Sequence, residues 1–338
     1  MQINKKKESV KMKKLLLLLL LPMTLSLYSC NAKTTTEDSS TVSSAEETSS
    51  ATVETEETDY TFTDSLDREV TVTSHEKTVV LSGSLAEIWQ LAGGELYGIT
   101  TDAYDEGHTL DLPDDIKNYG DVKNPSVESI IADDIDFVIL SGGIANQVKL
   151  EETLNSAGVT TAYFDVEDFD DYLTALKICT DITGRNDLYV ENGENIKKEV
   201  DAIIESVDSE VSPKILLLRA YSTGIKAKGS DNMTGQMLAD LGCVNIADSE
   251  TSLLEELSLE SIVLADPEFV FITTMGESEE AAIAQYEETL ASNPAWQELT
   301  AVKNDQVHIL PKDLYHYKPN NRWDEAYANL KEILYGKD

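Results

Sequence analysis

The residue types best suited to binding or chemistry gather near the C-terminus, in the segment 314–323 (LYHYKPNNRW). This segment follows a predicted strand at 307–310 and combines aromatic rings, one histidine and two cations. Such a surface is costly to leave in water unless something covers it. We therefore expect it to line a cleft, the alternative being a surface loop that leads into a final helix at 324–334. The side chains expected in the cleft are Tyr315, His316, Tyr317 and Arg322.

Arg219 ends a second apolar run, a predicted buried strand at 214–219. A charge in that position needs a partner, because burying an unpaired charge is costly. The partner is either a structural carboxylate or an anionic ligand, and the sequence leaves both possibilities open.

The sequence motifs of common enzymes are missing. It holds no G-x-S-x-G, no H-E-x-x-H and no Walker A loop. A zinc or manganese site needs several convergent nitrogen or oxygen ligands, whereas the histidines here are scattered. They are His75, His108, His308 and His316. We therefore expect no enzyme, no metal site and no resident cofactor, with His308 structural and His316 the one histidine in the cleft.

Short apolar runs that fit strands alternate with helical patterns from residue 60 onward. This alternation predicts an α/β fold with mainly parallel sheets. The pattern runs through 60–184 and starts again over 210–338. Between these parts, 185–209 carries a helical apolar stripe. We therefore expect two α/β lobes joined by one long helix.

The residues just after the predicted strands are the remaining binding candidates. Ligands of open parallel sheets bind beyond the carboxyl ends of the strands. The residues at those ends are small, hydroxylic or aromatic, and nearby glycines let a ligand approach the backbone. Besides Arg219, those expected to contact a ligand are Ser82, Ser84, Thr101 and Ser141 in the first lobe and Tyr221, Thr274 and Met275 in the second.

An internal repeat supports two similarly built lobes. The segment 126–141 (SVESIIADDIDFVILS) aligns without gaps to 258–273 (SLESIVLADPEFVFIT). Self-similarity of this kind is the mark of a repeated structural unit. The alternative is chance likeness between two generic helix-strand units. The pairs that fall in register are Glu128 with Glu260, Ser129 with Ser261, Asp134 with Asp266, and Phe137 with Phe269.

The N-terminal residues 1–29 combine a lysine-rich start with a short apolar core, as secretory signals do. The core is too short to cross a bilayer comfortably. It ends in Leu-Tyr-Ser-Cys at 27–30, which resembles a lipobox, so we expect Cys30 to be acylated. Translation starts at Met1 or at Met12. Residues 30–59 are rich in serine, threonine and acidic side chains and predict a disordered tether.

The formal charge of the chain is −37, and the signal itself is positive. Phosphate binding needs basic patches, so nucleic acid is excluded as a partner. Anionic lipid is disfavoured as well, which leaves an acyl chain as the membrane anchor. Cys179 and Cys243 lie in apolar contexts and predict buried thiols, with a disulfide as the alternative.

These segments together resemble the periplasmic-binding-protein-like family whose members bind iron–siderophore, haem or cobalamin. The matching phrases span nearly all of the folded part and lie at 70–72, 118–121, 125–130, 183–185, 242–247, 265–270 and 294–303 (PAWQELTAVK). The resemblance implies the class III fold, in which one rigid helix joins two Rossmann-like lobes. It also implies a monomeric substrate-binding lipoprotein of an ABC importer, held at the extracytoplasmic face of the cell membrane and working with a permease and an ATPase.

The family's docking glutamates, one on each lobe, correspond to Glu128 and Glu260. Their alternative role is to compensate the charge at helix N-termini. The resemblance leaves the cargo open. A ferric siderophore would suit Arg219 and Arg322, whereas haem would take an axial ligand and a corrinoid an aromatic slot. The candidate axial ligands for haem are Tyr315, His316, Tyr317 and Met275.

We expect a ferric siderophore first, then haem, then cobalamin. Two other classes of protein remain as rivals. One is an extracellular metallo-enzyme or chelatase on the same fold, and the other is a surface adhesin or sensor.

Overall fold

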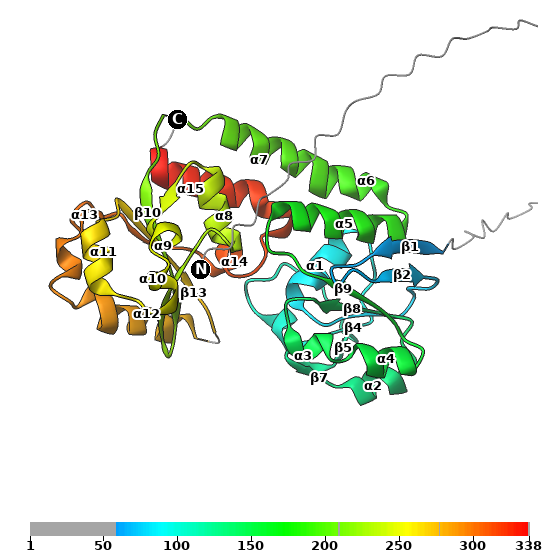
Figure 1. Ribbon diagram of the computed structural model, residues 1–338. Coiled ribbons are helices and arrows are strands. Elements are labelled where there is room, and N and C mark those ends of the chain that lie inside the picture. The colour runs from blue at the N-terminus through cyan, green and yellow to red at the C-terminus, as the bar shows by residue number, and fades with distance from the viewer. Residues whose placement is uncertain (1–58, 209, 277, 337–338) are drawn as a thin grey trace, which may run out of the picture. The chain divides into compact units, whose positions relative to one another are not determined.

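The computed structural model describes residues 59–336 except 209 and 277 (Figure 1). The predicted signal, Cys30 and the tether up to residue 58 lie outside the described residues. Among the helices within this range, none is long and apolar enough to span a bilayer.

The N-terminal lobe is built on a parallel sheet with the order β5-β4-β3-β8-β9. Numbered along the chain, these strands run third, second, first, fourth, fifth, which is the Rossmann order. The connections change direction between β3 and β8, and this switch point is where such sheets bind ligands. The strands are β3 (Thr78–Val80), β4 (Gly98–Ile99), β5 (Lys117–Asn118), β8 (Phe137–Ser141) and β9 (Thr160–Phe164).

Alternating side chains of this sheet enter two separate cores. Val80 and Ile139 join one cluster and Val79 and Val138 the other, because successive strand residues point to opposite faces. The first face is covered by α1 (Gly83–Leu91) and α5 (Phe169–Thr183), and the second by α2 (Val127–Ala132) and α4 (Glu151–Ser156). Also present are the hairpin strands β1 (Tyr60–Thr63) with β2 (Glu69–Val72) and β6 (Gly120–Asp121) with β7 (Asn124–Pro125), the helix α3 (Ala145–Val148) and a 3₁₀ turn, Thr101–Tyr104.

The C-terminal lobe has the strand order β11-β10-β13-β14, with β12 also paired to β10. All pairs are parallel except the β10–β11 hairpin. Its switch point lies between β10 and β13. The strands are β10 (Lys214–Tyr221), β11 (Gly224–Lys228), β12 (Val244–Asn245), β13 (Phe269–Thr274) and β14 (Val307–Ile309).

The helices of this lobe also lie on two faces. One face holds α8 (Met233–Asp240), α14 (Lys312–Tyr315) and α15 (Trp323–Tyr335). The other holds α9 (Ile246–Ser249), α10 (Ser252–Glu255), α11 (Leu259–Ala265), α12 (Glu279–Tyr286) and α13 (Thr300–Lys303). Together with the N-terminal lobe, this layering confirms the predicted α/β class with two lobes of mainly parallel sheet.

The segment between the lobes is continuous helical backbone. It consists of α6 (Asn186–Tyr189), a π-helical turn at Val190–Glu194, and α7 (Asn195–Glu205). In Figure 1, α7 runs beside α15 of the C-terminal lobe, and the two helices are in contact. The helix predicted over 185–209 is therefore present from 186 to 205, while the exact lobe boundaries stay a prediction.

The internal repeat folds the same way twice. In each copy a short helix carries a fully buried isoleucine, Ile130 on α2 and Ile262 on α11, both 0% exposed. The aligned aspartates Asp134 and Asp266 both have positive φ angles, 55° and 46°. Asp is one of the few residue types that enters this left-handed region readily. The chain therefore passes from the helix to the following strand through the same backbone conformation in both lobes.

Cys179 and Cys243 are both free thiols. Cys179 is buried as predicted, whereas Cys243 is only partly buried. Burial raises the pKa of both thiols, that of Cys243 to about 12.

Candidate functional site

The candidate site lies at the carboxyl ends of the strands that flank the two switch points. Ser82 and Ser84 follow β3, and Ser141 ends β8 in the N-terminal lobe. Arg219 and Tyr221 end β10, and Met275 follows β13 in the C-terminal lobe. The topology therefore brings these predicted residues to the two edges where open sheets bind ligands.

Arg219 stands in a row across three strands of the C-terminal lobe. It lies opposite Lys226 on β11 and opposite Thr273 on β13, so the three side chains share one face. Its Nε donates to Thr273 Oγ1 at 3.4 Å. Among the residues that the structure describes, no carboxylate lies within 4.0 Å of the guanidinium. Of the two partners left open by the sequence, the structural carboxylate is therefore absent from this part of the chain.

Thr274 points to the opposite face of the same sheet. It is 1% exposed, and its hydroxyl donates to Glu279 Oε1 of α12 at 3.4 Å. Because strand side chains alternate, Thr273 faces the arginine while its neighbour does not. Met275 follows at the strand end and is 36% exposed. The Thr274 side chain therefore points away from Arg219, and its predicted ligand contact stays a prediction.

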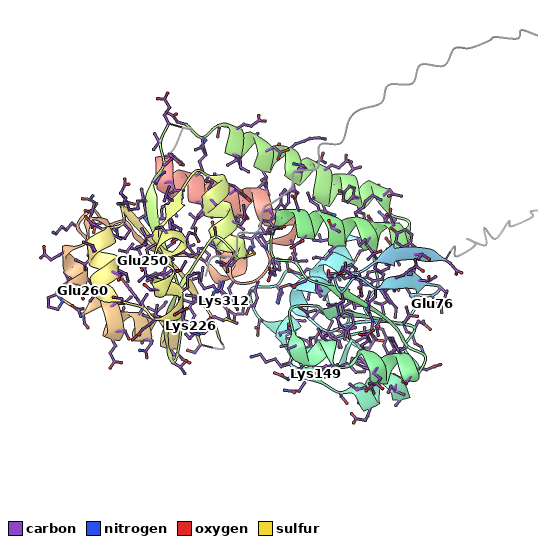
Figure 2. The ribbon with its side chains drawn as sticks, viewed as in Figure 1. Glu76, Lys149, Lys226, Glu250, Glu260 and Lys312 are labelled. Carbon is purple, nitrogen blue, oxygen red and sulfur yellow. The ribbon has the colours of Figure 1, made fainter. Side chains whose placement is uncertain are left out.

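The segment after β14 brings two further cations, Lys312 and Lys318, to the same region as Arg219. Lys312 Nζ donates to the carbonyl oxygen of Gly276 at 3.1 Å and lies 4.9 Å from the centre of the Tyr317 ring. Burial, followed by the positive charges of Arg219, Lys312 and Lys318, lowers the pKa of His316 to about 4. The imidazole is therefore neutral at physiological pH. Arg219, Lys312 and Lys318 form a positive patch beside it, which the nearby Asp105 carboxylate opposes. Figure 2 labels two cations of the C-terminal lobe, Lys226 and Lys312.

Lys318 is the cation of this patch that reaches toward the other lobe. Burial lowers the pKa of its ammonium group, and the carboxylates of Asp165 and Glu167 in the N-terminal lobe act against this effect. Its backbone N–H donates to Ser84 Oγ at 3.5 Å. Lys318 therefore stands between the two switch points.

Tyr315 and Arg322 are already engaged inside the C-terminal lobe. Tyr315 is 1% exposed, and its hydroxyl donates to the carbonyl oxygen of Ala326 at 2.8 Å. Arg322 forms ion pairs with Glu325 at 2.7 Å and Asp313 at 2.9 Å. These partners occupy the polar groups that a ligand would use, and the ligand contacts of both residues stay a prediction.

Two predicted residues of the N-terminal lobe are held by local hydrogen bonds. The exposed Thr101 donates its hydroxyl to the carbonyl oxygen of Gly120 at 3.0 Å. The backbone N–H of Ser141 donates to Gln147 Oε1 at 2.7 Å. Both residues stand at strand ends of the N-terminal lobe. The Ser141 contact uses its backbone N–H and leaves the hydroxyl uninvolved.

The two lobes meet through the segment 316–322. Tyr317 donates its hydroxyl to Asp105 Oδ2 at 2.7 Å, and its ring lies 4.6 Å from that of His108. Asn320 Nδ2 donates to the carbonyl oxygen of Ser84 at 3.2 Å and also contacts Glu87 Oε2. Sequence reasoning missed Glu87, His108 and Asn320. His108 could have been selected from the sequence, because it lies in the same loop after a predicted strand as Thr101.

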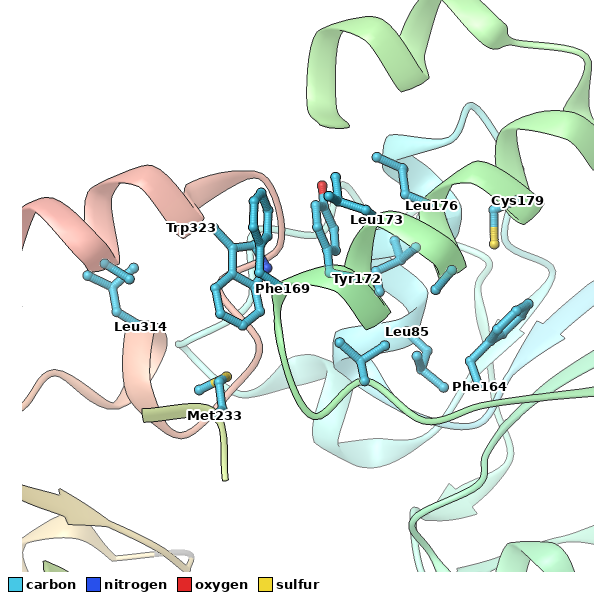
Figure 3. Packing of buried hydrophobic residues seen from close by; sticks show 14 of the residues in the cluster. Leu85, Phe164, Phe169, Tyr172, Leu173, Leu176, Cys179, Met233, Leu314 and Trp323 are labelled. Carbon is cyan, nitrogen blue, oxygen red and sulfur yellow. The ribbon is translucent and has the colours of Figure 1, made fainter. Parts of the chain in front are cut away.

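An aromatic cluster closes the junction behind these polar contacts. Trp323, at the start of α15, lies 5.3 Å from Phe169 and 6.4 Å from Tyr172, both on α5 of the N-terminal lobe. Figure 3 shows these three rings next to one another, and Trp323 is tilted against both of the others. Trp323 is 1% exposed, so the apolar core is continuous from one lobe to the other at this point.

Two pockets of the described part of the chain lie away from Arg219 and His316. The larger, of about 380 Å³, lies along β14 and α15 and is lined in part by His308, Tyr315 and Asn329. The smaller, of about 100 Å³, lies between β1, β9 and α5 and includes Asp165 and Asp171. His308, predicted to be structural, is partly buried and bonds to Gln306 Oε1 at 2.9 Å. Within residues 59–336 as described, no group of three or more His, Cys, Asp or Glu side chains could hold a metal ion.

Glu128 and Glu260 occupy equivalent exposed positions near the starts of α2 and α11. Figure 2 places Glu260 at the outer edge of the C-terminal lobe. Both side chains are therefore accessible to a partner protein.

Two Rossmann-like lobes, one connecting helix and opposed switch points define a two-lobed solute-binding protein. The model of the periplasmic binding protein family matches residues 78–314, and the chain belongs to that family. No curated protein matches the sequence.

The fold is similar to solved structures of substrate-binding proteins. One is an ABC transporter substrate-binding protein from Listeria monocytogenes EGD-e, with 19% identity, 78% of this chain and 100% of that chain covered, and a TM-score of 0.63. Another is Staphylococcus aureus SirA complexed with staphyloferrin B, with 18% identity, coverage of 81% and 98%, and a TM-score of 0.65. A third is S. aureus IsdE complexed with heme, with 15% identity, coverage of 77% and 98%, and a TM-score of 0.61. At these identities the likeness concerns the fold.

Proposed function

We propose that the protein is the substrate-binding subunit of an ABC importer and that its cargo is a negatively charged iron complex. The observation that carries this proposal is Arg219, a guanidinium at a switch point with no carboxylate partner among the described residues. Lys226 stands opposite it, and Lys312 and Lys318 add further positive charge nearby. Arginine pairs well with the carboxylate groups that many ferric siderophores carry.

The structural neighbours agree with an iron complex without deciding which one. SirA was solved with staphyloferrin B and IsdE with heme. One observation favours haem as the second candidate. His316 has a pKa of about 4, so its ring nitrogens are free of the extra proton that would prevent binding to iron. Met275, 36% exposed just after β13, is a second axial-ligand candidate. Cobalamin is the third candidate.

The remaining parts of the proposal concern the membrane. The protein is anchored through acylated Cys30 on the extracytoplasmic face, acts as a monomer, and docks on a permease that an ATPase drives. Glu128 and Glu260 are the docking residues, since both are exposed at matching positions of the repeat. In cells, E128Q together with E260Q should reduce uptake while the purified variant keeps its affinity for cargo. A loss of cargo affinity in this variant would contradict docking as the role of the two glutamates.

Calorimetric titration with ferric citrate, a ferric catecholate, haemin and cyanocobalamin tests the cargo. Saturable binding of one ferric chelate, with haemin weaker, is the expected result. Binding of none of the four would overturn the transport proposal. Metal analysis of the purified protein separates it from a metallo-enzyme on the same fold, which would retain stoichiometric metal without any chelator.

A further inference from the structure

The contact between the lobes contains a buried carboxylate, Glu87 on α1. It is 6% exposed, and no lysine or arginine among the described residues pairs with it. Its Oε1 accepts from the backbone N–H and the hydroxyl of Thr109. Its Oε2 lies 3.5 Å from His108 Nδ1 and accepts from Asn320 Nδ2 at 2.5 Å. A buried charge needs such donors, so losing one of them has a high cost.

Asn320 brings the C-terminal lobe to this carboxylate. It is 1% exposed, and the same amide nitrogen reaches the carbonyl oxygen of Ser84. Its φ angle is 54°, in the left-handed region where Asn is one of the best tolerated residues after Gly. Both the backbone conformation and the side-chain hydrogen bonds at position 320 therefore favour asparagine.

Two residues near the proposed cargo site lie close to Asn320 in the chain. Lys318 lies two positions earlier and Tyr317 three, and Tyr317 is fixed against Asp105 of the other lobe. A Cβ added at Gly107 would come within 2.3 Å of the Tyr317 ring, so the ring packs directly on that backbone. A shift of Asn320 would therefore move Lys318 and Tyr317 together.

The polar groups here are not all satisfied. Asn320 Oδ1 is buried without a hydrogen-bond partner among the described residues, and His108 Nδ1 makes its 3.5 Å contact with Glu87 Oε2 without the geometry of a hydrogen bond. Buried polar groups are nearly always paired, and exceptions occur where function constrains the residues. A junction selected for stability alone would pair both atoms with hydrogen-bond partners. A junction that must also hold the two lobes at a fixed spacing can leave such atoms unpaired.

We propose that Glu87 and Asn320 form a tie between the lobes that positions the segment 316–322 and thereby sets the affinity for cargo. The proposal rests on the proposed function. Both are positioning residues, since they act through Tyr317 and Lys318 and not through the cargo itself.

Two variants remove the tie in different ways. E87Q keeps the shape of the side chain and removes its charge. N320G removes the amide, and glycine accepts the positive φ without strain. D64N is the matched control, because Asp64 is also a buried carboxylate, 5% exposed, but its partners Arg68 and Tyr163 lie within the N-terminal lobe.

Hydrogen exchange of the segment 316–322 without ligand is the first measurement, and the affinity for ferric citrate is the second. We expect E87Q and N320G to speed exchange in this segment and to weaken binding by about tenfold, the equivalent of one hydrogen bond to a charged group. D64N should lower the thermal midpoint without either effect. If both variants behave like D64N, the tie is only structural and the proposal is overturned. If the wild type binds no ferric citrate, that cargo fails, and the exchange measurement still decides the tie.

Discussion

The Tyr317 hydroxyl of the C-terminal lobe donates to the Asp105 carboxylate of the N-terminal lobe, 2.7 Å away and 212 residues apart in sequence. We expect Y317F to lower the free energy of unfolding by about 1.5–3 kcal/mol, the range for hydrogen bonds to charged groups, with the lower end favoured because Asp105 is exposed. Urea denaturation measures this. Y104F is the control, since Tyr104 is 51% exposed. Equal stability of Y317F and the wild type would show that this bond contributes nothing to the junction.

Arg219 should be the cation that cargo binding depends on most. R219Q is expected to weaken binding of a ferric carboxylate chelate by about tenfold or more, the equivalent of one hydrogen bond between charged groups. R185Q is the matched control, because Arg185 is an exposed arginine paired with Asp187. Calorimetry with both variants measures the difference. Unchanged affinity in R219Q would remove this residue from the site.

His316 should make the protein less stable in mild acid. Its folded pKa of about 4 lies below the ordinary value of 6.5. In the window between these values the unfolded chain takes up a proton that the folded chain does not, so stability falls as the pH falls. Between pH 7 and pH 5 the loss from this one group is about 2 kcal/mol.

Urea denaturation of the wild type and of H316Q at both pH values measures this effect. Because other groups titrate alike in both proteins, the difference between them isolates the histidine. The wild type should lose more stability than H316Q. Parallel pH profiles would mean that the imidazole is not desolvated in solution.

The two thiols in the described part of the chain should resist alkylation in the native state. Burial raises the pKa of Cys179 and Cys243, and the reactive species is the thiolate. Iodoacetamide at about pH 8 should leave both peptides unmodified and modify both after unfolding. Mass spectrometry of the peptides measures this. Fast native labelling of Cys179 would contradict its 1% exposure.

Much of the architecture could be predicted because it depends on local patterns of apolar and polar residues. The strands β10 and β13 begin in apolar runs, and the repeat predicts equivalent positions for Ile130 and Ile262, both fully buried. The helix α5 is missing from the sequence analysis although Asp168 caps its start and Gly184 ends it with φ of 70°.

The details of the site depend on tertiary structure, which local patterns do not contain. Which of Thr273 and Thr274 faces Arg219 is fixed by the pairing of β13 with β10. The pairing of Arg322 with Asp313 depends on the turn between α14 and α15. The contact between Glu87 and Asn320 joins residues from different lobes and has no signature in sequence.

Within the described residues, Arg219, Lys226, Lys312 and Lys318 all stand on the C-terminal lobe, while the chain as a whole carries a formal charge of −37. From a distance, an anionic cargo therefore meets a repulsive field and reaches attraction only close to Arg219. Screening acts over about 8 Å at physiological ionic strength, so added salt weakens the long-range repulsion before it weakens the short-range attraction. If the proposed anionic cargo is correct, its association with the protein should speed up as salt is added, the reverse of what a positively charged receptor would show.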